Sequence, residues 1–111
     1  MTRPAAPAVE RDDAENRYEI SVEGRRAGFV AYRDRERQRV FYHTEIDDAF
    51  AGKGLAGVLV REALTDARAA GLRLVAVCPY VAKFVKRHEE FGDAVDPVTP
   101  AILQWLDVKP S

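Results

Sequence analysis

The N-terminal half of the chain carries the alternating pattern of β-strands. Polar and apolar residues alternate from Tyr18 to Val22, which predicts a half-buried strand. A turn signal follows, and residues 27–32 predict a second strand, so the two are expected to pair as a hairpin. After a charged connection, the pattern predicts a third and longer strand over residues 39–46.

The second half begins with a helical pattern. From residue 54 to residue 70, apolar side chains recur at steps of three and four and form one stripe. This stripe consists of Leu55, Val58, Leu59, Ala63, Ala67 and Ala70. We expect Gly71 to end the helix, because glycine is common at the position that follows a helix C-terminus.

Shorter elements complete the chain. Residues 73–77 predict a buried strand, residues 80–89 a second helix, and residues 100–106 a closing helix or strand. A strand, a helix and a strand in succession imply a right-handed crossover with parallel strands. The pattern therefore predicts an α/β fold whose mixed sheet has antiparallel N-terminal strands and a parallel strand-helix-strand crossover.

Composition sets the domain organisation. Residues 1–16 are rich in proline, alanine and charge, which predicts a flexible N-terminal tail. The chain has 111 residues, of which 47% are hydrophobic and 32% charged, so we expect one globular domain over residues 17–111. The sequence alone leaves its oligomeric state as a monomer or a weak dimer.

Charge and cysteine content limit the partners. The formal net charge is −1 and the arginines are interleaved with acidic residues, so neither nucleic acid nor an anionic membrane is an expected partner. No stretch of about 18 apolar residues occurs, and the N-terminus lacks an apolar signal core. The single cysteine, Cys78, excludes an internal disulfide and fits a reducing compartment, so we expect a cytoplasmic protein.

A glycine-rich loop precedes the first helix. Gly52, Gly54 and Gly57 lie between the third strand and the helix N-terminus. Glycines let backbone N–H groups turn inward, and a helix N-terminus adds unpaired N–H groups, so a phosphate or a diphosphate is a suitable ligand. The alternative is that the glycines only form a tight turn. The spacing lacks the Ser/Thr of a P-loop, and the chain is too short for the Rossmann array that G-x-G-x-x-G implies.

Cys78 follows the predicted strand 73–77 and precedes Pro79 and the second helix. The carboxyl ends of parallel strands meet at one edge of a sheet, so Cys78 and the glycine-rich loop are expected at the same edge. A thiol beside a helix N-terminus is a candidate nucleophile or acyl acceptor. The alternative is that Cys78 is a small buried hydrophobic residue.

The glycine-rich loop resembles the acetyl-CoA loop of the GNAT superfamily of N-acetyltransferases, Gln/Arg-x-x-Gly-x-Gly/Ala. Gly54 and Ala56 fill its last two positions, whereas Ala51 stands where Gln or Arg is usual. Four successive blocks resemble a small, minimal subgroup of this superfamily, and together they cover about residues 18–96. These blocks are Phe41-Tyr42-His43-Thr44-Glu45-Ile46, Phe50-Ala51-Gly52-Lys53-Gly54-Leu55-Ala56, Cys78-Pro79-Tyr80-Val81-Ala82-Lys83-Phe84 and Arg87-His88-Glu89-Glu90-Phe91. Glu89 departs from the proline of the subgroup.

This resemblance implies a minimal GNAT fold that binds acetyl-CoA and transfers its acetyl group to an amine, either a small molecule or a protein lysine. It assigns the catalytic role to Cys78. We add Glu45 as a candidate general base, and the alternative is that Glu45 is a solvated carboxylate at the edge of the sheet. The expected cofactor-binding residues are Thr44, Glu45, Ile46, Asp47, Ala51, Gly52, Lys53, Gly54, Leu55, Ala56, Gly57, Lys83 and Lys86. The alternative is a non-catalytic module or adaptor that binds CoA or acyl-CoA.

Each of the two histidines, His43 and His88, has more than one possible role. No Cys-x-x-Cys or His-x-x-x-His pair occurs, so no structural metal is expected. His43 has the strand parity of Phe41 and Glu45, and it is either a base or an ordinary histidine of a sheet face. His88 either faces a CoA phosphate or caps the C-terminus of the second helix, and we favour the cap.

Overall fold

The computed structural model describes residues 7–107, which form one six-stranded sheet with three α-helices. The strands lie side by side in chain order, antiparallel from β1 to β4 and parallel from β4 to β6. Their bounds are β1 Ala8–Asp12, β2 Arg17–Val22, β3 Arg25–Arg35, β4 Gln38–Ile46, β5 Arg73–Ala76 and β6 Val95–Asp96. The helices are α1 Leu55–Ala69, α2 Pro79–Arg87 and α3 Pro100–Asp107, with short 3₁₀ turns η1 Asp48–Phe50 and η2 Glu89–Ala94.

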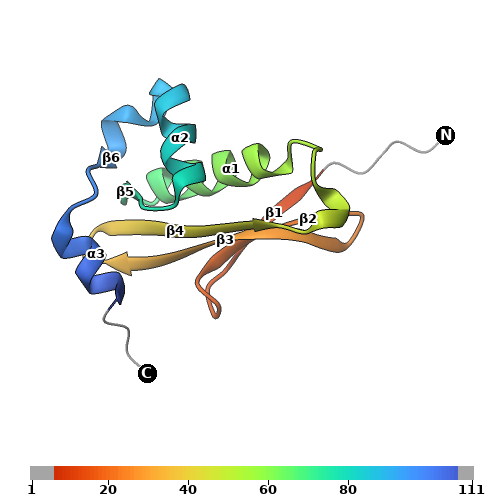
Figure 1. Ribbon diagram of the computed structural model, residues 1–111, viewed down its shortest axis with the longest axis horizontal. Helices are drawn as coiled ribbons and strands as arrows, with labels where there is room; N and C mark the ends of the chain where they lie inside the picture. The colour runs from red at the N-terminus through yellow and green to blue at the C-terminus, as the bar shows by residue number, and fades with distance from the viewer. Residues whose placement is uncertain (1–6, 108–111) are drawn as a thin grey trace.

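The helices cover the sheet unequally. Helices α1 and α2 lie on one face, and α3 packs against the other face near one end of β4 and β5 (Figure 1). The main core fills the space between α1, α2 and the sheet, and a smaller cluster of Val40, Val75 and Ile102 lies under α3. Among the described residues, no helix covers much of the face opposite α1.

Most of the expected elements are confirmed. The hairpin of β2 and β3, the long β4 and the parallel pairing of β4 with β5 agree with the predicted α/β class. The closing segment is helical, and α2 begins at Pro79, which is well suited to the first position of a helix. The predicted stripe of α1 was wrong in part: Val58 and Ala70 are exposed, whereas Val60 and Leu64 are buried.

The expected N-terminal tail is corrected for residues 8–12. These residues form β1, which pairs along its whole length with β2. The strand has little apolar content because it lies at the edge of the sheet, where backbone hydrogen bonds rather than burial hold it. Residues 1–6 of the expected tail, and residues 108–111, lie outside the described residues.

A β-bulge at Tyr42 changes the direction of side chains along β4. Tyr32 lies opposite Phe41 and Ala31 lies opposite His43, so Tyr42 is an extra residue in the pairing. An inserted residue moves every later side chain to the other face of the sheet. The expectation that His43 shares the face of Phe41 was therefore wrong, because Thr44 takes the face that Phe41 occupies.

Strands β4 and β5 separate soon after the bulge. The backbone N–H groups of Val77 and Cys78 both donate to the carbonyl of Phe41, at 3.0 and 2.9 Å, and β5 ends there. The next residues of β4, up to Ile46, pair only with β3 in the described part of the chain. An open strand edge therefore lies within the sheet, where β4 continues past the end of β5 (Figure 1).

A polar network around the buried Arg39 holds the opposite end of β4. Arg39 is 7% exposed and donates to both carboxylate oxygens of Asp34, at 2.8 and 2.9 Å. It also donates to the hydroxyl of Tyr18 at 2.7 Å, and this hydroxyl donates to Asp66 at 2.6 Å. The network joins β2, β3, β4 and α1, so the separation of β4 from β5 starts from a rigid base.

Candidate functional site

The glycine-rich loop forms an uncapped helix N-terminus. Asp47 accepts a hydrogen bond from the backbone of Ala49 at 3.0 Å and starts the turn η1, after which Gly52 and Gly54 both adopt positive φ. Gly54 is the N-cap of α1, with φ 73° and no side-chain cap. The first N–H groups of α1 therefore have no side-chain cap at Gly54 and are available to an external acceptor.

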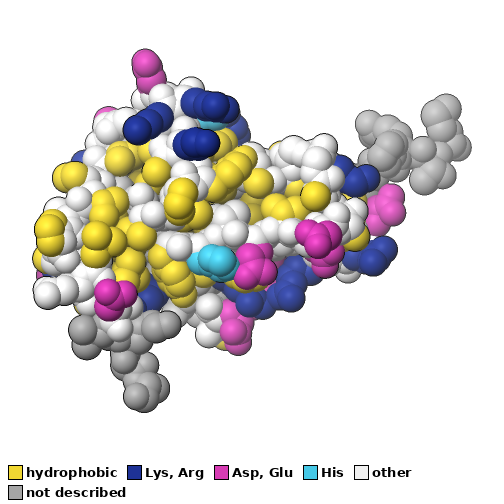
Figure 2. Space-filling view, viewed as in Figure 1, with side chains coloured by type: hydrophobic (Ala, Val, Ile, Leu, Met, Phe, Trp, Pro, Cys, Tyr) yellow, Lys and Arg dark blue, Asp and Glu magenta, His cyan; other side chains and the backbone are white. Residues whose placement is uncertain are grey.

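A groove begins at this helix N-terminus. It has a volume of about 620 Å³ and runs between the first half of α1 and α2. Its lining residues are Gly54, Gly57, Val58, Arg61, Glu62, Tyr80, Lys83, Phe84, Arg87 and His88. Three of these side chains are cationic and one is acidic, so the groove favours an anionic ligand. Lys and Arg side chains gather over α2 beside apolar surface in Figure 2.

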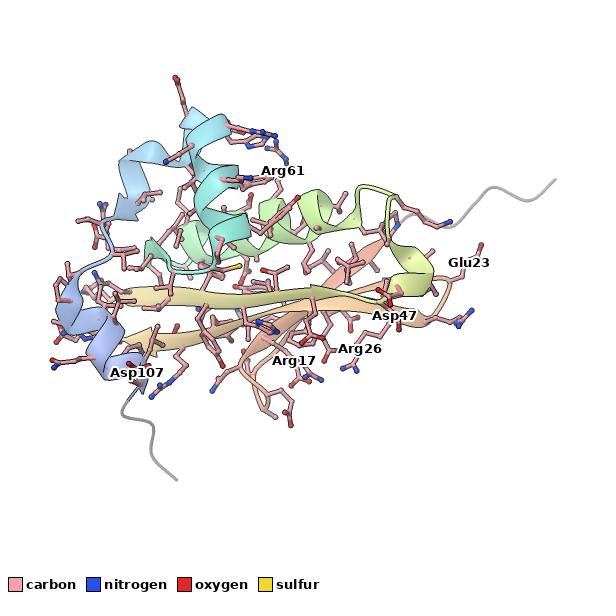
Figure 3. All side chains as sticks on the ribbon, in the orientation of Figure 1. Arg17, Glu23, Arg26, Asp47, Arg61 and Asp107 are labelled. Atoms are coloured by element: carbon pink, nitrogen blue, oxygen red, sulfur yellow. The ribbon has the colours of Figure 1, made fainter. Side chains whose placement is uncertain are left out.

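The groove includes some of the predicted cofactor-binding residues and leaves out others. Gly54, Gly57 and Lys83 line it, whereas Lys86 does not. Arg61 and Arg87 line it although the sequence analysis missed them. Figure 3 shows Arg61 between α1 and α2, on the opposite side of the sheet from Arg17 and Arg26. The spacing of Lys83 and Arg87, four residues apart on a predicted helix, was the signal for Arg87.

Cys78 lies where the two strands separate. It is the N-cap of α2 and is 5% exposed. Its Sγ lies 3.2 Å from the Oγ1 of Thr44, within hydrogen-bonding distance. The bulge at Tyr42 makes this contact, because it turns Thr44 toward the helices. A residue expected to contact the cofactor and the expected nucleophile are thus brought together.

Glu45 lies on the other face of β4. Its Oε2 is 2.7 Å from the Nε2 of His43, and both side chains are more than half exposed. The ring of Phe29 lies beside His43, with 5.9 Å between the ring centroids. Glu45 and Cys78, the two expected catalytic residues, therefore flank the open edge of β4 from opposite faces.

His88 takes the capping position that we favoured. It is the C-cap residue of α2, and its Nδ1 donates to the carbonyl of Phe84 at 2.8 Å. Its ring also stacks on Phe84, with 3.9 Å between centroids and 15° between planes. Because His88 lines the groove as well, its two expected roles are compatible.

Comparison with known proteins identifies the family. A family model described as GCN5-related N-acetyl-transferase matches residues 17–95. The chain belongs to the GCN5-related N-acetyltransferase family. This match confirms the resemblance found in the sequence, and it supports an enzyme of the N-acetyltransferase class. No curated protein matches the chain.

A solved structure is similar to this member of the family. It is the NMR solution structure of a GCN5-like N-acetyltransferase candidate from Staphylococcus aureus. The TM-score is 0.63 at 19% sequence identity, and the match covers 84% of this chain and 91% of that chain. The similarity confirms the expected GNAT fold. Within residues 7–107, no helix has the length and apolar character needed to cross a bilayer.

Proposed function

We propose that this protein is an acetyl-CoA-dependent N-acetyltransferase that moves an acetyl group to an amine, either a small molecule or a protein lysine. One observation carries the proposal. The uncapped N-terminus of α1 opens into a cationic groove, and the open edge of β4 beside it leads to a buried thiol. An anionic ligand with a long arm and a reactive thioester matches each part of this arrangement.

The backbone N–H groups from Gly52 to Gly57 are the proposed site of the CoA diphosphate. They combine unpaired donors with the positive end of the α1 dipole. The backbone of residues 44–47 is the proposed partner of the pantetheine arm, because an extended chain that carries amides can pair with an open strand edge. Lys83 adds positive charge within the groove.

The chemistry has two balanced routes. In the first, the amine nitrogen attacks the thioester carbon, the C–N bond forms, the C–S bond breaks and the CoA thiolate leaves. In the second, the sulfur of Cys78 attacks the thioester carbon, the C–S bond to CoA breaks, and the departing CoA thiolate takes up the thiol proton of Cys78. The amine then attacks the acetylated Cys78, the new C–N bond forms, and the Cys78 thiolate leaves. Both routes release one proton from the amine, and His43 with Glu45 forms the proposed acceptor for it.

A pair of measurements tests the proposal. Titration calorimetry with CoA measures binding, and the release of free CoA thiol from acetyl-CoA measures transfer to spermidine, to N-α-acetyl-lysine methyl ester and to a lysine peptide. We expect binding together with amine-dependent thiol release, and an acetylated amine identified by mass spectrometry. CoA binding without transfer to any amine would instead favour the non-catalytic module.

A further inference from the structure

The end of the groove that lies away from Gly54 carries positive charge without an ion-pair partner among residues 7–107. Lys83 and Arg87 both line the groove, and both are exposed. The ion pairs found within 4.0 Å among residues 7–107 include neither of them. The third cation of the groove, Arg61, is paired with Glu90 at 2.8 Å. Lys83 and Arg87 are therefore the cations available to a ligand.

The two available cations stand one turn apart on α2. Tyr80 marks the near end of the groove, because its hydroxyl would lie 3.7 Å from a Cβ built on Gly57. With a rise of about 1.5 Å per residue, Lys83 is about 5 Å and Arg87 about 10 Å further along the helix axis. A second anionic group, separate from one bound at the N-terminus of α1, fits between their side chains.

Flat rings lie beside these cations. The ring of His88 is held parallel to Phe84 by their stacking, and the hydrogen bond from Nδ1 to the Phe84 carbonyl fixes its orientation. Phe84 and His88 both line the groove, so this end offers aromatic surface next to positive charge. A planar base attached to a phosphorylated sugar has the matching chemistry.

We propose that the Lys83–Arg87 end of the groove binds a phosphomonoester on an adenine nucleotide, namely the 3′-phosphate of CoA, and thereby selects CoA over dephospho-CoA. The proposal rests on the proposed function for the binding of CoA and is independent of acetyl transfer. Guanidinium and ammonium groups form strong charge-assisted hydrogen bonds with a phosphate dianion.

Titration calorimetry of CoA and dephospho-CoA tests this site in a ligand-by-variant cycle. The wild-type protein is expected to bind CoA at least about tenfold more tightly than dephospho-CoA. In the double variant Lys83→Gln/Arg87→Gln, the ratio should fall below about threefold, chiefly through weaker binding of CoA. Lys86→Gln is the matched control for the single variants Lys83→Gln and Arg87→Gln, because each of the three removes one positive charge from α2 and Lys86 does not line the groove. Each of the single variants Lys83→Gln and Arg87→Gln should lower the ratio, whereas Lys86→Gln should keep the wild-type ratio.

Each outcome decides the proposal. Equal affinities for the two ligands in the wild-type protein overturn it, even where acetyl transfer is intact. An equal loss of selectivity in Lys86→Gln also overturns it. The selectivity would then depend on the overall positive charge of α2 and not on the position of Lys83 and Arg87. Selectivity that is kept while no amine is acetylated supports this site and refutes only the proposed transfer. A wild-type protein that binds neither ligand overturns both proposals.

Discussion

Gly54→Ala separates the role of the glycine-rich loop in ligand binding from its role in folding. Gly54 has φ 73°, and a Cβ built on it meets no atom within 4 Å. An alanine in this left-handed conformation lowers the free energy of unfolding by roughly 1–2 kcal/mol. The reduced conformational freedom of the unfolded chain offsets about half of a kcal/mol of this loss. The expected net loss of stability is about 1 kcal/mol, or about 5 °C in Tm.

The effect on binding is expected to be larger. The new methyl group projects at the mouth of the groove, where a phosphate must approach the N–H groups of α1. CoA affinity should fall at least tenfold, or about 1.4 kcal/mol. Gly71→Ala is the matched control: Gly71 has φ 82°, its Cβ would also meet nothing within 4 Å, and it lies beyond the other end of α1.

Thermal unfolding and titration with CoA measure the two effects on the same samples. Gly54→Ala and Gly71→Ala should lose similar stability, and only Gly54→Ala should lose affinity. A Gly54→Ala protein that is destabilised like its control yet binds CoA within twofold of the wild type would refute the diphosphate site. Equal losses of affinity in both variants would show that the change acts through general destabilisation.

Three further predictions concern the thiol of Cys78, the carboxylate of Asp66 and nucleic acid as an excluded partner. Cys78→Ser should reduce transfer at least about a hundredfold and leave CoA affinity within about threefold, and only the wild-type thiol should become acetylated in mass spectra after incubation with acetyl-CoA. The hydrogen bond from Tyr18 lowers the pKa of Asp66. The stabilisation by this ionised carboxylate is therefore present above its unfolded-state pKa and is lost as the pH falls through its folded-state pKa. Urea denaturation should show that the free energy of unfolding depends less on acid pH in Asp66→Asn than in the wild type. A gel-shift assay at physiological salt should show no complex with DNA or RNA, and a submicromolar, salt-dependent complex would contradict this.

The elements that position the proposed cofactor site were predictable because each has a strong local signal. Helix α1 has an apolar stripe over four turns, and Gly54 and Gly71 mark its two ends. The strand before it and the short strand after it differ in length but share the period and composition of buried strands. A strand-helix-strand connection in one sheet makes its two strands parallel, as β4 and β5 are. The glycine-rich loop and Cys78 were therefore correctly placed at the edge where these two strands end.

Residues that depend on helix phase or on pairing partners were harder to predict. At about 100° per residue, Arg87 lies about 40° from Lys83 on the side of Tyr80, and Lys86 lies about 60° away on the other side. Only the groove shows which side faces α1. Strand β1 gave no signal because a charged edge strand is specified by its partner β2 and hardly by its own apolar content.

The bulge at Tyr42 decides which side chains share a face at the end of β4, and the sequence carries no local signal for it. Strict alternation along β4 groups Phe41, His43 and Glu45 on one face and would direct Thr44 away from Cys78. One unpaired residue reverses this arrangement, since the pairing of Tyr32 and Ala31 shifts around it. The thiol then receives Thr44 as its neighbour, and the His43–Glu45 pair is left on the opposite face. Because β4 and β5 separate at the same point, the proposed mechanism requires an acyl group at the thiol and a base on the other face to act on one amine through the open edge.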